Sequence, residues 1–212
     1  MSWVENKRFI SFEGIDFSGK STQIDLLKKY LESRHQKVYF IREPGGTRIS
    51  EKIRKILLDH RNATMEPRTE ILLYSAARAQ LVSETIIPLL KQGYFVIADR
   101  YVDSTTAYQG YGREMDLTMV DHINQAATLG LLPGITFYLE LHPEIARQRM
   151  QASGRSADRL EKAGIDFFVR VFKGYKIIAE TNTQRFCIIN AEQSIDVIHH
   201  IIRQEVTKRL DL

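Results

Sequence analysis

A phosphate-binding loop is the clearest chemical signal in this sequence. Residues 14–22 match the pattern G-x-x-x-x-G-K-[ST], between a predicted strand and a predicted helix. Glycines let the backbone curl so that its N–H groups point inward at an anion. Lys20 is expected to neutralise nucleotide phosphates, and the Ser21 hydroxyl to bind Mg²⁺. The candidate nucleotide-binding residues are Gly14, Ile15, Asp16, Phe17, Ser18, Gly19, Lys20, Ser21 and Thr22.

An acid and a base stand next to each other at the end of a predicted strand, at Asp99 and Arg100. Ligands of open α/β sheets bind at the carboxyl ends of the strands. Asp99 can hold a metal ion or its waters, and Arg100 can bind an accepting phosphate through two N–H groups. A solvent-facing ion pair is the alternative, but the phosphate-binding loop on a nearby strand favours the chemical interpretation.

Three further side chains could bind a flat base. Tyr74 and Arg78 are four residues apart on a predicted helix and therefore lie on one face, where a ring and a guanidinium group meet. The Gln109 amide both donates and accepts, so it could complement the edge of a pyrimidine imide. A tyrosine at this spacing is more often part of the core, and only the neighbouring motifs favour a base pocket.

The hydrophobic pattern predicts the elements that must position these residues. Short apolar runs predict strands at 9–13, 37–41, 95–99, 135–140 and 186–190, and amphipathic stretches predict helices at 22–31, 67–92, 143–150, 165–181 and 194–210. Nearly continuous apolar strands are typical of a parallel sheet covered on both faces. We therefore predict an α/β fold of the P-loop NTPase type, with a five-stranded parallel sheet and helices on both faces. No repeat or linker divides residues 1–212, so we expect a single domain, with a polar, flexible lid at about 151–162.

Composition restricts the class of protein. The chain has 212 residues and a formal net charge of only +4, with the basic residues dispersed, so nothing favours a nucleic-acid partner. No apolar run approaches the roughly 18 to 20 residues that span a bilayer. The single cysteine, Cys187, lies in an apolar run and is expected to pack in the core. We predict a cytoplasmic protein without a membrane partner.

Four stretches resemble the thymidylate kinase (dTMP kinase) family, and the similarity runs from about Phe9 to the last predicted helix. They are Phe12-Glu13-Gly14, Arg42-Glu43-Pro44-Gly45-Gly46-Thr47, Leu72-Leu73-Tyr74-Ser75-Ala76-Ala77-Arg78, and Asp99-Arg100-Tyr101 continuing to Ser104-Thr105-Thr106-Ala107-Tyr108-Gln109-Gly110. The resemblance implies transfer of the γ-phosphoryl group of ATP to dTMP, giving dTDP and ADP with Mg²⁺ present. It also implies a homodimer joined through helices, to which Ile123 or the helix at 71–90 could contribute.

The resemblance implies a role for each matching residue. Asp16 would contact the deoxyribose 3′-hydroxyl group, Tyr74 would stack on thymine, and Arg78 would reach its O4 atom. Tyr108 would lie against the sugar, where a ribose 2′-hydroxyl group would collide. The remaining expected contacts are those of the monophosphate with Glu43, Pro44, Arg54 and Arg100, and those around the base with Ser104, Thr105 and Gln109.

Two positions depart from the family pattern. Phe17 stands where one branch of the family has an arginine that stabilises the transferring phosphoryl group. In the other, bacterial-type branch this cation comes from a flexible lid, which residues 154–161 resemble, with Arg159 as the first candidate and Arg155 as the second. Tyr74 is the second departure, because many relatives have Phe there, and its hydroxyl group needs a partner or water.

Three other functions stay open at this stage. A kinase for another nucleoside or nucleoside monophosphate would share the fold. A catalytically silent nucleotide-binding protein, or an ATPase that acts on nucleic acid, would also carry a phosphate-binding loop. A GTPase switch is disfavoured because the sequence contains no N-K-x-D motif for guanine.

Overall fold

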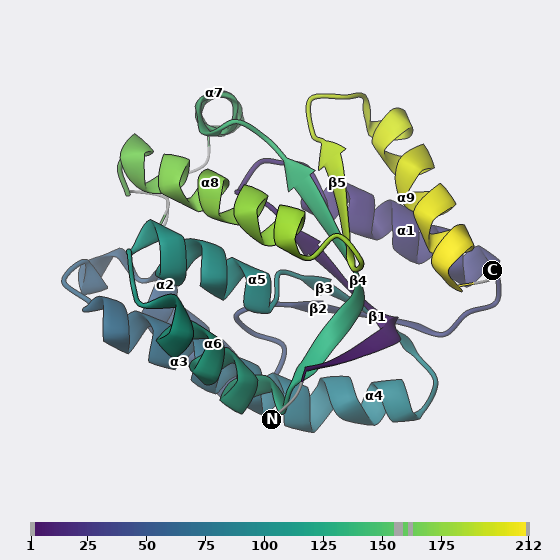
Figure 1. The fold of residues 1–212 in the computed structure, drawn as a ribbon, viewed down its shortest axis with the longest axis horizontal. Helices are drawn as coiled ribbons and strands as arrows, with labels where there is room; N and C mark the ends of the chain where they lie inside the picture. Colours follow the sequence, from purple (N-terminus) through teal and green to yellow (C-terminus); the bar gives the residue numbers. More distant parts are fainter. Residues whose placement is uncertain (1–2, 155–158, 161–162, 211–212) are drawn as a thin grey trace.

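A parallel sheet of five strands forms the centre of the molecule (Figure 1). The computed structural model describes residues 3–154, 159–160 and 163–210. The strands are β1 (Val4–Glu13), β2 (Val38–Arg42), β3 (Phe95–Asp99), β4 (Leu131–Glu140) and β5 (Phe186–Asn190), in the order β2-β3-β1-β4-β5. Phe12 of β1 lies beside Asp99 of β3 and Phe137 of β4, so the predicted site residues follow adjacent strand ends. The predicted α/β fold with a five-stranded parallel sheet is confirmed.

Helices cover both faces of the sheet, as the sequence predicts. They are α1 (Lys20–Ser33), α2 (Arg48–Leu58), η1 (His60–Asn62), α3 (Pro67–Leu81), η2 (Val82–Ile86), α4 (Ile87–Lys91), α5 (Val102–Thr105), η3 (Thr106–Gly112), α6 (Leu117–Thr128), α7 (Pro143–Ser153), α8 (Ile165–Thr181) and α9 (Ile195–Leu210). Alternate strand residues point to opposite faces. Ile10 packs with the buried side chains of α1 and α9, whereas Phe9 packs with those of α3 and η2.

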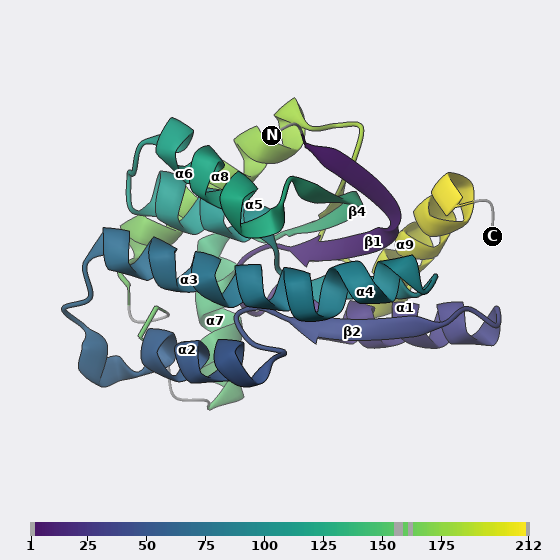
Figure 2. The same cartoon turned by 90° about the horizontal axis from the view of Figure 1, so that it is seen from below.

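The predicted helix at 67–92 is one continuous rod with a π-helical turn inside it (Figure 2). This turn, η2, ends just before the first turn of α4, which contains Pro88. Because proline has no N–H group and its ring collides with the carbonyl four residues earlier, a regular α-helix cannot pass through it undisturbed. Gly93, with φ +81°, follows the rod.

Several element boundaries differ from the prediction. Helices α2 and α6 lie outside the predicted set, although each begins at a side-chain cap: Thr47 accepts from the Ser50 amide, and Asp116 from the Met119 amide. Helix α7 continues to Ser153, so the expected lid begins later than 151. Lid residues 155–158 and 161–162 lie outside the described residues.

Cys187 on the edge strand β5 packs against the core, as expected. Burial raises the pKa of its thiol to about 11, which keeps the thiol protonated at neutral pH. Within the described residues, no helix combines the length and the apolar character that a transmembrane segment needs.

Candidate active site

The phosphate-binding loop connects β1 to α1, and Lys20 is the first residue of α1. Gly14 has φ +131°, and a Cβ atom there would lie 2.6 Å from the carbonyl oxygen of Leu139, so the position requires glycine. Lys20 Nζ donates to the carbonyl oxygens of Gly14 (3.1 Å) and Ile15 (2.9 Å). Burial, followed by repulsion from Arg100, lowers the pKa of Lys20 to about 8. The loop therefore holds a desolvated cation where phosphates would bind.

Phe17 occupies a backbone conformation that normally favours glycine, with φ +64°. Its carbonyl oxygen accepts a hydrogen bond from Arg149 Nη1 (3.1 Å), and Arg149 Nη2 donates to the carbonyl oxygen of Ala191 (3.1 Å). The loop also borders a cavity of about 240 Å³ whose other walls come from α7, α8 and the residues before α8. Arg149 is absent from the predicted site, because its position on α7 carries no motif.

Arg100 connects the phosphate-binding loop to the end of β3. Its backbone is left-handed, with φ +74°, and its amide donates to the carbonyl oxygen of Phe12 (3.0 Å). Arg100 Nη1 donates to the carbonyl oxygen of Gly14 (2.6 Å), and Nη2 donates to Asp16 Oδ1 (2.9 Å) and Tyr108 Oη (3.3 Å). One guanidinium group therefore joins three of the predicted site residues.

The residues around Asp99 fit a hard divalent cation. Asp99 Oδ1 is buried and has no hydrogen-bond partner among the described residues, which leaves a carboxylate oxygen available to a metal ion. Ser21 lies in the first turn of α1, on the phosphate-binding loop. No group of three His, Cys, Asp or Glu side chains in the described part of the chain could hold a metal. A Mg²⁺ ion here would therefore draw further ligands from phosphates and water.

A second cavity, of about 100 Å³, lies next to Arg100. It is lined by Asp16, Glu43, Pro44, Arg54, Leu58, Tyr74, Arg78, Arg100, Ser104, Thr105, Tyr108, Gln109 and Leu160. Every residue that the sequence predicts to contact the acceptor's phosphate, sugar or base is among them, whereas Asp99, also a candidate for this site, is not. We call this space the acceptor cavity. Segments that are far apart in the sequence, from the loop after β2 to η3, are thus brought to one place.

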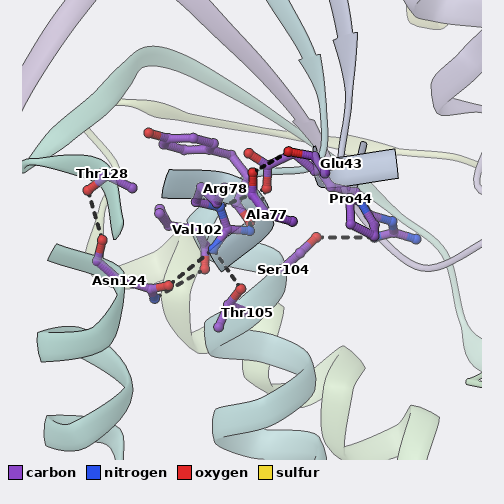
Figure 3. A network of polar contacts seen from close by, with 12 residues as sticks. Glu43, Pro44, Ala77, Arg78, Val102, Ser104, Thr105, Asn124 and Thr128 are labelled. Atoms are coloured by element: carbon purple, nitrogen blue, oxygen red, sulfur yellow. Dashed lines mark hydrogen bonds and ion pairs between the residues drawn. The ribbon is translucent and has the colours of Figure 1, made fainter. Parts of the chain in front are cut away.

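Arg78 anchors the wall of the acceptor cavity (Figure 3). Its side chain is buried, and Nη2 lies 2.6 Å from Glu43 Oε2 while Nε donates to the same oxygen (2.7 Å). Nη1 donates to Thr105 Oγ1 (2.8 Å) and Asn124 Oδ1 (3.3 Å), and Nη2 donates to the carbonyl oxygen of Tyr101 (3.0 Å). Burial raises the pKa of Glu43 despite the pairing. These contacts join α3, α5 and α6 to the loop after β2.

Glu13 is the centre of a buried network beside Arg100. Glu13 Oε1 accepts from the Tyr101 amide (2.7 Å), and Oε2 accepts from Ser104 Oγ (2.6 Å) and Tyr175 Oη (2.9 Å). Arg100 Nη1 donates to both of these hydroxyl oxygens, at 3.3 and 3.2 Å. Sequence reasoning missed Glu13 and Tyr175, although a charged residue that ends an apolar strand was a usable signal for Glu13.

Tyr108 lines the acceptor cavity and is packed among other aromatic rings. Its ring lies edge-on to the rings of Phe167, Phe168 and Tyr175, and Arg100 lies over its face at 5.2 Å. Burial raises the pKa of the phenol well above its usual range. A fixed, neutral ring of this kind can exclude a substituent by its shape.

Arg159, expected to be a catalytic cation, is buried near the acceptor cavity. Its Nη2 atom lies 2.6 Å from Glu70 Oε2, and its Nε atom donates to the carbonyl oxygen of Leu57 (2.7 Å). The described contacts of Arg159 are therefore with α2 and α3 and not with the phosphate-binding loop. The second candidate, Arg155, lies outside the described residues.

Comparisons with known proteins agree with this geometry. A family model described as thymidylate kinase matches residues 12–202. The chain is 44% identical over 203 residues to a thymidylate kinase of Caldanaerobacter subterraneus subsp. tengcongensis, covering 96% of both chains. It is 47% identical over 201 residues to a thymidylate kinase of Chlorobaculum tepidum, covering 91% of this chain and 94% of that protein. With such matches over nearly its whole length, the chain belongs to the thymidylate kinase family.

Proposed function

We propose that this chain transfers the γ-phosphoryl group of ATP to the 5′-phosphate of dTMP, giving dTDP and ADP, as a step of dTTP biosynthesis. The observation that carries the proposal is the bridge between two anion sites: Arg100 touches the phosphate-binding loop at Gly14 and also lines the acceptor cavity. A phosphate bound in each site would lie near the same guanidinium group, as direct transfer between two nucleotides requires.

Alignment and charge neutralisation carry the chemistry. The acceptor phosphate is already an anion at pH 7, so no general base is needed, and the site must instead offset the repulsion between two polyanions. Lys20 serves the donor phosphates, whereas Arg100 and Arg54 serve the acceptor phosphate. Arg54 Nη1 donates to the carbonyl oxygen of Pro44 (2.8 Å), and both residues line the acceptor cavity. Loss of one preorganised contact of this kind typically lowers the rate roughly 100-fold or more.

Asp99 and Ser21 are our candidates for holding Mg²⁺. Support comes from the buried Asp99 oxygen that has no hydrogen-bond partner among the described residues. When bound, Mg²⁺ neutralises charge on the β- and γ-phosphates. Asp16 orients the acceptor sugar in this proposal. Its ion pair with Arg100 (2.9 Å) holds its carboxylate beside the acceptor cavity, which both residues line.

The base and sugar contacts follow the same cavity. Tyr74 stacks on thymine, while Thr105 and Gln109 lie by its polar edge. Arg78 would reach O4 by sharing N–H groups that already donate to protein partners. Ser104 also lines this cavity, and its hydroxyl group donates to Glu13. Tyr108 excludes a ribose 2′-hydroxyl group through its fixed position.

The lid arginines complete the proposed site. Phe17 has no charge to offer the transferring phosphoryl group, so Arg155 and Arg159 remain the candidates for this cation. Arg159 could reach that group only by leaving its 2.6 Å ion pair with Glu70. We further propose a homodimer, and the cytoplasm as the place where the enzyme meets its two substrates.

An acceptor panel under one concentration of Mg·ATP tests the proposed function. We expect ADP formation to depend on an acceptor and to be fastest with dTMP, compared with dCMP, UMP and thymidine. A preference for another acceptor would favour the alternative of a kinase for a different nucleoside or nucleoside monophosphate. If the rate of ADP formation is the same with and without every acceptor but rises when DNA is added, the protein does not phosphorylate nucleotides.

A further inference from the structure

Glu70 of α3 is a fully buried carboxylate with partners from two other parts of the chain. Its Oε1 atom accepts from Gln109 Nε2 (2.9 Å) and Arg113 Nε (3.2 Å), and its Oε2 atom accepts from Arg113 Nη2 (3.1 Å). Arg159 Nη2 lies 2.6 Å from Oε2. Burial alone would raise the pKa of Glu70, but the hydrogen bonds from Arg113 and Gln109 bring it below its usual value. Glu70 is therefore a charged acceptor inside the protein.

An ionised carboxylate dictates how the neighbouring amide is oriented. Because a carboxylate can only accept hydrogen bonds, the Gln109 amide must turn its NH₂ group toward Glu70. Gln109 is 2% exposed and lines the acceptor cavity. The amide oxygen, Oε1, has no hydrogen-bond partner among the described residues. It is also not one of the fully buried side-chain atoms that lack a partner. The polar atom that Gln109 can offer a ligand in the cavity is thus an acceptor.

We propose that Glu70 sets the base specificity of the acceptor cavity by holding the Gln109 amide oxygen toward the ligand. This inference rests on the proposed function, since it concerns the base of the accepting nucleotide. Thymine carries an N–H donor at N3, which an amide oxygen can bind. Cytosine carries a lone pair at N3, which the same oxygen repels. A glutamine without Glu70 could rotate its amide and satisfy either base.

The two arginines have a defined part in this arrangement. A protonated Glu70 could donate to the amide oxygen of Gln109 and allow the reverse orientation. Arg113 and Arg159 keep the carboxyl group ionised, and Arg113 is itself supported by the ring of Phe167, 4.7 Å from its guanidinium carbon. Glu70 and its arginines are therefore positioning residues, which act on the base through Gln109.

The test uses Glu70→Gln, which keeps the size of the side chain but allows it to donate or accept. We measure kcat/KM for dTMP and for dCMP with Mg·ATP. We expect the wild type to prefer dTMP and Glu70→Gln to lose about 10- to 100-fold of that preference, by a loss with dTMP and a gain with dCMP. The matched control is Glu66→Gln, at an exposed position one turn earlier, which should leave both values unchanged.

The ratio of the two substrates separates specificity from structural damage. A general distortion of α3 would lower both kcat/KM values together, and an unchanged ratio in Glu70→Gln would overturn the inference. If Glu70→Gln does not fold, Arg113→Gln decides, because it removes a partly exposed cation that keeps Glu70 ionised and should shift the ratio in the same direction. A wild type that shows no preference for dTMP would instead refute the proposed function itself.

Discussion

Glu13 is a carboxylate fully buried at the end of β1, where three hydrogen bonds converge on it. Burial, followed by the nearby charge of Asp103, raises its pKa from the ordinary 4.5 to about 7. Between these two pH values the folded protein binds a proton that the unfolded chain has released. The contribution of Glu13 to the free energy of unfolding therefore falls as the pH rises from about 4.5 to 7, and is lowest above that window.

We expect Glu13→Gln to gain stability relative to the wild type as the pH rises through this window. The amide keeps hydrogen-bonding capacity but has no ionisation to complete, so the difference should grow to at most about 3 kcal/mol, given about 1.4 kcal/mol per pKa unit. Urea unfolding between pH 5 and pH 8 measures it. The control is Glu5→Gln on the exposed part of the same strand, for which the difference should stay flat. A flat difference for Glu13→Gln as well would mean that burial does not penalise its charge.

Sequence reasoning found most of the residues that line the acceptor cavity and missed those that hold them in place. Gly14, Gly19 and Lys20 belong to the phosphate-binding motif, and Arg100 follows Asp99 at a strand end, so local sequence patterns identify them. Asn124 and Tyr175 act through the packing of α6 and α8, which spacing does not encode. Glu70 could have been found, because it lies four residues before Tyr74, on the same helix face.

At the scale of elements, the close contact between α8 and η3 requires glycine at position 174 of α8. A Cβ atom at Gly174 would lie 2.6 Å from Cγ of Tyr111, the part of that side chain least able to move away. Gly174 therefore lets α8 approach closely and brings its neighbour Tyr175 to Glu13 and Ser104. The position of the whole helix controls part of the network around Arg100.

Gly174→Ala should destabilise the protein by about 1–3 kcal/mol, as overpacking does. Helix propensity alone predicts the opposite sign, because alanine in a helix interior is ordinarily favoured over glycine by about 1 kcal/mol. The rate of dTDP formation should fall as well, since Tyr175 would shift. Gly164→Ala is the control, at the N-cap of the same helix with no atom within 4 Å of the added methyl group. It should cost less, no more than about 1 kcal/mol, which is the usual cost of alanine at an N-cap. Equal denaturation midpoints for the two variants would contradict the close-approach argument.

The strands were easier to predict than the helices for a physical reason. Core strands are apolar along most of their length because helices cover both faces, and such runs stand out in a sequence. Helix α2 was not predicted, although its apolar residues Ile49, Ile53, Ile56 and Leu57 recur at helical spacing and were a usable signal. The π-helical turns η2 and η3 leave no period of their own, so the boundaries within 67–92 and the helical segment at 106–112 could not be derived.

At the scale of the whole molecule, two neighbouring helices, α3 and α6, each expose a large apolar side chain. Leu72 on α3 is 58% exposed, and Leu117 at the start of the neighbouring α6 is 43% exposed. Leu72 lies two residues after Glu70 in the helix. Its side chain therefore points to the side of α3 opposite the acceptor cavity. The proposed homodimer needs apolar side chains to bury, and this side of α3 is our candidate for that interface.

We therefore expect the wild type to sediment as a dimer and Leu72→Glu as a monomer at the same concentration. A carboxylate buried at a symmetric interface would face its own copy, and neither charge would have a partner. The control is Val197→Glu on α9, which removes a comparably exposed side chain (46%) elsewhere on the molecule and should leave the dimer intact. Because α3 also carries Glu70, Tyr74 and Arg78, loss of the partner would loosen the wall of the acceptor cavity, so we expect KM for dTMP to rise more than KM for ATP in Leu72→Glu. A dimer that survives Leu72→Glu would move the interface away from the outer face of α3 and remove this link between assembly and substrate binding.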